Sequence, residues 1–164
     1  TNRTKTEAEE FIEASRMFIT QEFLPMLTHC LERMPDEDIW WRPNEKSNSV
    51  GNLVLHLCGN VRFWLIKSVG RGEYQRNREA EFAADGPIPK AELIASLRSA
   101  VNEADKILED LPMSRLLERH AIVRYNTSGL QAVYHVIEHF SRHMGQILYV
   151  YKMRTGRDID FHLG

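Results

Sequence analysis

Three histidines stand close together near the carboxyl end of the sequence, at His135, His139 and His143. Residues four apart on a helix lie on one face, about 6 Å apart along its axis. Two imidazoles so placed can bind one ion at the usual nitrogen–metal distance of about 2.0 to 2.1 Å. Spacing alone does not choose between the pair His135 and His139 and the pair His139 and His143. Such a pair is also common as a plain surface or interface feature.

Apolar residues at helical intervals indicate that His139 and His143 flank a buried stripe, formed by Val136, Phe140, Ile147 and Tyr151. Another histidine, His56, lies inside the apolar run 53–58. A buried imidazole without a partner loses its hydration at a cost of roughly a few kcal/mol. Alone, His56 would be a hydrogen-bonded core histidine, but one shared ion would satisfy all three side chains. We therefore predict a metal site made of His56, His139 and His143, with His135 hydrogen-bonded to a ligand or on the helix flank.

Four segments with helical periodicity would position these histidines, at about 6–34, 49–68, 89–111 and 128–154. Ser47 or Ser49 can cap the second, and Ser128 with Gln131 has the spacing of a capping box for the last. Pro25 should kink or split the first. The pattern predicts an all-α fold: a single domain over residues 1–164, built as a four-helix bundle with a long crossover connection.

The connections between these helices differ in character. Residues 39–49 form a loop longer than a simple connector, and residues 71–87 form a charged, glycine-containing crossover that we expect to be exposed and free of regular structure. Residues 114–126 show no clear helical period, and residues 121–125 within them could be a short strand or an extended loop.

Composition excludes several classes of protein. The chain has 164 residues, 43% of them hydrophobic, and a net charge of −2 without a basic tract, which argues against nucleic-acid binding. Its apolar runs fall short of the roughly 20 residues of a membrane span, and its amino terminus has no signal-peptide core. We expect a cytoplasmic protein in which Cys30 and Cys58 are reduced core thiols.

Three motifs resemble the DinB/YfiT-like superfamily of metalloenzymes: residues 41–45 (WRPNE), 49–60 (SVGNLVLHLCGN) and 139–147 (HFSRHMGQI). Residues 76–82 (RNREAEF) resemble a motif found in one branch of uncharacterised bacterial proteins. The resemblance implies an up-down-down-up bundle, a metal triad of His56, His139 and His143, and a homodimer. The chain departs from the family where Arg142 and Met144 flank the last ligand, positions often occupied there by His and Arg.

The resemblance also implies a function. Three histidines leave coordination positions of a divalent metal, Zn or Ni, open for substrate. Relatives with assigned activities resemble thiol-dependent S-transferases, in which a low-molecular-weight thiol attacks a small-molecule electrophile. Two alternatives to a transferase are a metal-dependent hydrolase and a noncatalytic, stress-associated dimeric binding protein.

Other polar and aromatic side chains could serve this site. Arg42 could hold a substrate carboxylate, and Trp41 could form part of the pocket rim. Alternatively, Trp41 could plug one end of the bundle, and Arg42 could pair with an acidic side chain on the surface. The remaining candidates for orienting ligands or substrate are His135, Gln146, Asn52 and Asn60. Residues 76–79 we expect to form a solvated or dimer-contact loop.

Overall fold

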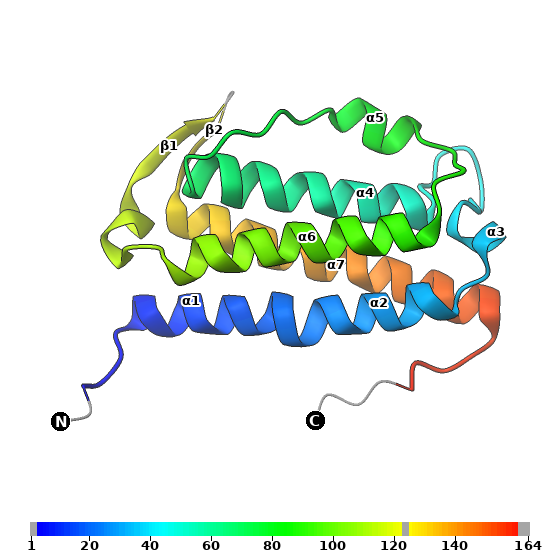
Figure 1. Ribbon diagram of the computed structural model, residues 1–164, viewed down its shortest axis with the longest axis horizontal. Helices are drawn as coiled ribbons and strands as arrows, with labels where there is room; N and C mark the ends of the chain where they lie inside the picture. Colours follow the sequence, from blue (N-terminus) through cyan, green and yellow to red (C-terminus); the bar gives the residue numbers. More distant parts are fainter. Residues whose placement is uncertain (1–2, 123–124, 161–164) are drawn as a thin grey trace.

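Four long helical segments lie side by side in the computed structural model, which describes residues 3–122 and 125–160 (Figure 1). The first comprises α1 (Glu7–Met17), the π-helical stretch η1 (Phe18–Phe23) and α2 (Leu24–Arg33). The second comprises α4 (Val50–Val61) and the π-helical stretch η2 (Arg62–Val69). The third is α6 (Lys90–Glu109), and the fourth is α7 (Gly129–Thr155).

The chain is all-α apart from one small hairpin, as the periodicity predicted. In Figure 1 the first and fourth segments run from left to right, and the second and third run from right to left. The short helix α3 (Asp36–Ile39) follows α2, and a 3-10 turn, η3 (Met113–Leu117), follows α6. The antiparallel strands β1 (Arg119–Ile122) and β2 (Tyr125–Ser128) then lead into α7. Of the two conformations expected for residues 121–125, the strand is the one observed at residues 121, 122 and 125, while residues 123–124 lie outside the described part of the chain.

Pro25 divides the first helical segment without ending it. Proline lacks the N–H that would bond to the carbonyl four residues earlier, and its ring crowds that carbonyl. The wider turns of η1 come immediately before Leu24 and Pro25, where they relieve this conflict. The expected split thus takes the form of a π-helical stretch inside one continuous helical segment.

Side-chain caps set the starting points of the two helices that carry the candidate ligands. Ser49 caps α4 in a capping box with Asn52, so Ser49 and not Ser47 begins this helix. Ser128 and Gln131 form the predicted capping box of α7. Each box satisfies backbone N–H groups that the first turn of a helix leaves without partners.

The expectation for residues 71–87 was wrong in part. The crossover contains a helix, α5 (Arg78–Ala83), capped by Asn77 and packed along α4 (Figure 1). Glu81 on this helix is only 8% exposed, although its neighbours Glu79 and Ala80 are exposed. A six-residue helix is too short to show a hydrophobic period, so its buried side could not be recognised from the sequence.

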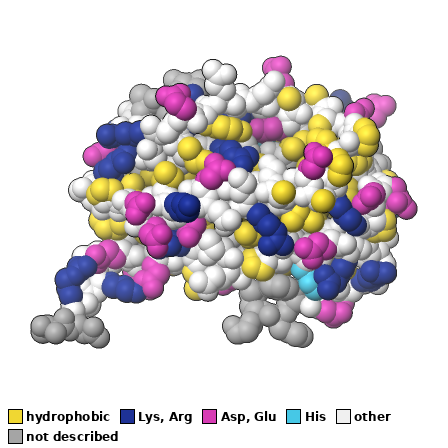
Figure 2. Space-filling model, in the orientation of Figure 1, with side chains coloured by type: hydrophobic (Ala, Val, Ile, Leu, Met, Phe, Trp, Pro, Cys, Tyr) yellow, Lys and Arg dark blue, Asp and Glu magenta, His cyan; other side chains and the backbone are white. Residues whose placement is uncertain are grey.

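The core lies between the four long segments and includes Leu53, Leu57 and Val61 of α4 and Trp64 of η2. Cys30 and Cys58 are free and buried, and burial raises the pKa of each thiol to about 11. On the face seen in Figure 2, basic and acidic side chains are interspersed with apolar ones. None of the helices in the described part of the chain is both long and apolar enough to cross a membrane.

Candidate metal centre

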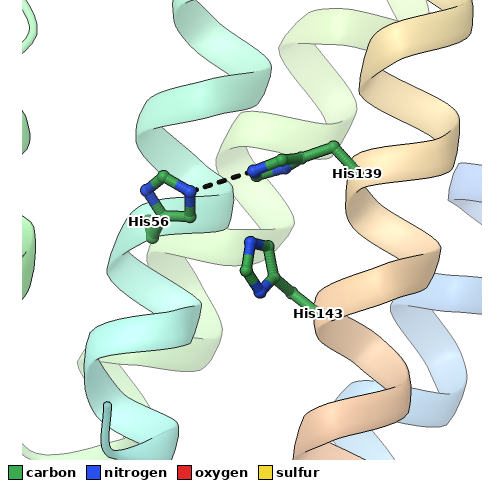
Figure 3. A group of neighbouring side chains, drawn as sticks. All are labelled: His56, His139 and His143. Atoms are coloured by element: carbon green, nitrogen blue, oxygen red, sulfur yellow. Dashed lines mark hydrogen bonds between the residues drawn. The ribbon is translucent and has the colours of Figure 1, made fainter. Parts of the chain in front are cut away.

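His56 on α4 and His139 and His143 on α7 meet between the two helices. One ring nitrogen from each lies within 4.8 Å of the others, and His56 Nε2 is 2.9 Å from His139 Nε2. Figure 3 shows the three rings turned toward one another across the gap between the helices. His56 is 5% exposed and His139 is 7% exposed, while His143 is partly buried. The structure thus brings together the three residues that the sequence selected.

A buried carboxylate holds His56 from the side opposite the other two histidines. Glu81 Oε2 lies 2.8 Å from His56 Nδ1. Arg76 binds the same carboxylate with two hydrogen bonds, Nε to Oε1 at 2.7 Å and Nη2 to Oε2 at 2.8 Å. Arg76 Nη2 is also 3.0 Å from His56 Nδ1, but an ionised carboxylate only accepts, so Nδ1 donates its proton to Glu81. The lone pair of His56 Nε2 is therefore free to face His139 and His143.

The close approach of α5 to α4 depends on two residues of α4. A Cβ atom at Gly59 would lie 2.0 Å from Glu81 Oε1, so only glycine leaves room for this carboxylate. Asn52 donates from Nδ2 to the carbonyl oxygens of Glu81 at 3.0 Å and Ala84 at 2.6 Å. The Asn52 side chain therefore fixes α5, one turn away from His56, and makes no hydrogen bond to the three histidines.

A second hydrogen bond orients His143. Its Nδ1 lies 2.6 Å from Gln146 Oε1, an oxygen that can only accept, so Nδ1 carries the proton and Nε2 keeps its lone pair. His139 differs, because its buried Nδ1 has no hydrogen-bond partner among the described residues. Glu81 and Gln146 thus select, in two of the three rings, the tautomer that a metal ligand needs.

Burial and crowding keep the imidazoles of His139 and His143 neutral. Desolvation, reinforced by His143 and His56, lowers the pKa of His139 to about 2. Desolvation also lowers the pKa of His143. Burial alone would raise the pKa of Glu81, but the hydrogen bonds from His56 and Arg76 outweigh it and the pKa falls below its usual value. Neutral imidazoles beside an ionised carboxylate are the protonation states that favour binding of a cation.

The residues present fit a divalent metal ion. Zinc and nickel accept imidazole nitrogen, and a catalytic zinc site commonly uses three protein ligands. The Nε2 atoms of His56 and His139 lie 2.9 Å apart, and the buried Nδ1 of His139 has no partner in the described part of the chain, so both rings would gain from a shared cation. His56, His139 and His143 could therefore hold such an ion.

A pocket of about 930 Å³ opens onto the three histidines. Aromatic side chains and arginines line much of it, together with several polar groups; the lining includes Asn60, Phe63, Trp64, Arg76, Arg78, Phe82, His135 and Arg142. Its size lies in the range of pockets that take small organic ligands.

The chain was compared with known families and structures. A family model described as "Protein of unknown function (DUF1572)" matches residues 6–161. The chain belongs to this family. No curated protein matches the chain in sequence.

Solved structures show that this DUF1572 member has the fold of DinB-like proteins. A conserved protein from Enterococcus faecalis aligns with a TM-score of 0.74 at 14% identity, over 88% of this chain and 97% of that one. The DinB-like protein YjoA from Bacillus subtilis aligns with a TM-score of 0.66 at 17% identity, over 88% and 94%. A DinB-like protein from Bacillus cereus aligns with a TM-score of 0.68 at 14% identity, over 92% and 95%. The fold that the resemblance implied is thus confirmed.

Two further candidates from the sequence, His135 and Asn60, line the pocket beside the histidine cluster. Asn60 Nδ2 lies 3.3 Å from His135 Nε2, and the His135 ring stands 5.3 Å from that of His139. His135 is not one of the three histidines whose nitrogens converge, and it makes no hydrogen bond that orients them. Of the two histidine pairs left open by the spacing, the structure brings His139 and His143 together with His56.

Trp41 and Arg42 lie away from this pocket. Trp41 packs under the guanidinium of Arg154, which also pairs with the buried Asp38. Arg42 donates to the carbonyl oxygens of Phe82 and Ala84, at 3.4 and 3.1 Å, at the end of α5. Neither residue is among those that line the pocket. Both stabilise the surroundings of the site without entering it.

Sequence reasoning missed Glu81 and assigned Arg76 to a solvated loop. The signal was present in the motif at residues 76–82, which has an arginine and a glutamate five residues apart. Nothing in that spacing indicates that both side chains turn inward against His56.

Proposed function

We propose that this chain is a metal-dependent enzyme that binds a small-molecule substrate in the pocket beside His56, His139 and His143. The observation that carries the proposal is the convergence of three imidazole nitrogens within 4.8 Å at the wall of a pocket. Structural zinc sites are typically closed by four protein ligands. Only three potential ligands form this group among the described residues, which favours a site that accepts an exogenous ligand.

Zinc or nickel bound at these three histidines would leave positions for a substrate, and would lower the pKa of a bound thiol or water. The chain's own residues supply the rest of the site. Glu81 and Gln146 hold two ligands in orientation, and the aromatic side chains Phe63, Trp64 and Phe82 limit the access of water.

Within this class we favour a thiol-dependent S-transferase over a hydrolase. Hydrolysis at a metal commonly uses a carboxylate as general base. None of the residues that line the pocket in the described part of the chain is Asp or Glu. A thiol, with an ordinary pKa of about 8.5, needs less help to ionise than water does. The motifs shared with DinB/YfiT-like proteins support the same choice.

The proposed reaction transfers a low-molecular-weight thiol to an electrophile. A sulfur–carbon bond forms, the bond from that carbon to its leaving group breaks, and the thiol proton departs with the leaving group or to solvent. The lining of the pocket offers His135 as a neutral imidazole that could accept this proton, because burial lowers its pKa.

A metal analysis separates this proposal from a noncatalytic binding protein. The protein should be purified without a nickel column, and its metal content compared with that of His56→Ala and His139→Ala. We expect about one zinc or nickel per chain in the parent, and a loss of metal with retained helicity in both variants. A metal-free parent, or variants that unfold, would favour the noncatalytic function.

Turnover is then tested with metal-loaded protein and a panel of thiols and electrophiles. Thiol consumption that requires both the metal and His139 would support the transferase. Hydrolysis of esters or amides without thiol would instead select the hydrolase.

A further inference from the structure

The charges that line the pocket have one sign. Its charged side chains in the described part of the chain are Arg76, Arg78 and Arg142, with no Asp or Glu among the lining residues. The histidines that line the pocket add no negative charge in either protonation state. A pocket with this lining attracts anions.

Two of the three arginines already have carboxylate partners. Arg76 is bound to Glu81 by two hydrogen bonds, and its side chain is only 11% exposed. Arg142 pairs with Glu138, one turn away on α7. A ligand at either guanidinium would therefore share it with a carboxylate that already partly neutralises its charge.

Arg78 has no carboxylate or other hydrogen-bond acceptor among the described residues. Its guanidinium lies over the ring of Phe82, 4.9 Å from the ring centroid. This contact restrains the guanidinium plane without using its N–H donors. Phe82 also packs near His56, with ring centroids 4.6 Å apart. Phe82 therefore links the unpaired cation to the histidine cluster.

We infer that Arg78 binds a carboxylate of the substrate while the reacting group lies at the three histidines. The guanidinium fork matches a carboxylate with two parallel hydrogen bonds. Phe63, Trp64 and Phe82 supply aromatic walls for the part of the molecule between these two points. The ligand class is thus a small organic acid with an apolar body. This inference rests on the proposed function, because it requires the histidines to hold a metal that a substrate can reach.

Two hydroxamates test this inference without turnover. Benzohydroxamate and its para-carboxylate derivative carry the same metal-binding group, and only the second carries a carboxylate. Their affinities for zinc-loaded protein can be measured by calorimetry in the parent and in Arg78→Gln. We expect the parent to prefer the carboxylate derivative by about fivefold, the order of one ion pair at an exposed arginine. Arg78→Gln should abolish this preference and leave benzohydroxamate binding unchanged.

Arg157→Gln is the matched control, because it removes the same charge from an exposed arginine outside the pocket. It should keep the preference. Equal affinities for the two hydroxamates in the parent would overturn the inference, as would a loss of both ligands in a folded Arg78→Gln variant. Failure of zinc-loaded parent protein to bind either hydroxamate would instead count against the proposed open metal site.

The origin of the carboxylate is settled by the same variant in the transfer assay. If the carboxylate belongs to the thiol, Arg78→Gln raises the KM for the thiol alone. If it belongs to the electrophile, the KM for the electrophile rises. An unchanged KM for both would overturn the assignment of Arg78.

Discussion

Glu81 Oε2 lies 2.8 Å from His56 Nδ1, and this contact joins a short crossover helix to the candidate metal site. The two residues are 25 positions apart in sequence, and both are buried. Arg76 completes the group by neutralising the carboxylate. Carboxylate–histidine pairs of this kind orient the ligand ring and make it a better electron donor.

Replacing Glu81 by glutamine should weaken metal binding. The amide keeps the size of the side chain but loses the charge that orients His56, so zinc affinity should fall by roughly 10- to 100-fold. A competition titration against a chromophoric chelator measures this change. Glu79→Gln, at an exposed position on the same helix, should have no effect. Equal zinc affinities in the parent and Glu81→Gln would show that the contact is not part of the site.

Two glycine substitutions should differ in their effects: one should weaken zinc binding, and the other should raise the stability of the fold. Gly59→Ala places a methyl group 2.0 Å from Glu81 Oε1, so the carboxylate must leave His56 and zinc affinity should fall. Gly145→Ala on α7 meets no atom within 4 Å, and alanine in a helix should raise the free energy of unfolding by about 0.5 to 1 kcal/mol. Urea unfolding and zinc titration of both variants check this prediction. It fails if Gly59→Ala binds zinc as tightly as Gly145→Ala does.

Asn52→Asp should destabilise the packing of α5. The carboxylate can still accept the capping hydrogen bond from Ser49, but it cannot donate to the carbonyl oxygens of Glu81 and Ala84. Leaving these groups without their donor should cost about 1 to 3 kcal/mol. Chemical unfolding measures the loss, and hydrogen exchange should show that it is concentrated in residues 78–84. Unchanged exchange in that segment would contradict the role assigned to Asn52.

The metal-free protein should lose stability on acidification. The folded pKa of His139 is about 2, whereas an unfolded histidine titrates near pH 6.5. Below about pH 6.5 the unfolded chain therefore binds a proton that the folded chain does not, and the free energy of unfolding falls. Urea unfolding at about pH 7.5 and 5.5 tests this, and His139→Gln should show a smaller decrease. Stability that is constant or higher at the lower pH would contradict the buried, neutral state of His139.

The helices and the three histidines could be predicted because short-range sequence patterns indicate both. Ser128 and Gln131 mark the start of α7 by a short-range capping box. His139 and His143 share a face through helical spacing alone. His56 was found because an imidazole inside an apolar run needs a partner.

The groups that surround the histidines could not be found in this way. Glu81 can be buried because Arg76 and His56 bind its carboxylate and Gly59 leaves room for it. These contacts form only in the folded chain, so no local sequence pattern indicates them. A charged segment such as residues 76–82 has the composition of a solvated loop, so composition predicted the wrong environment. Trp41 and Arg42 were selected for their chemistry, but chemistry alone does not indicate toward which side of the domain a loop residue points. The expected homodimer stays a prediction.

Anomalous diffraction from zinc-loaded crystals tests the metal site most directly. The account predicts one strong zinc peak about 2.0 to 2.1 Å from the Nε2 atoms of His56, His139 and His143, with Glu81 still bound to His56 Nδ1. A fully loaded crystal with the zinc at other residues, or with His56 outside the coordination sphere, would contradict it.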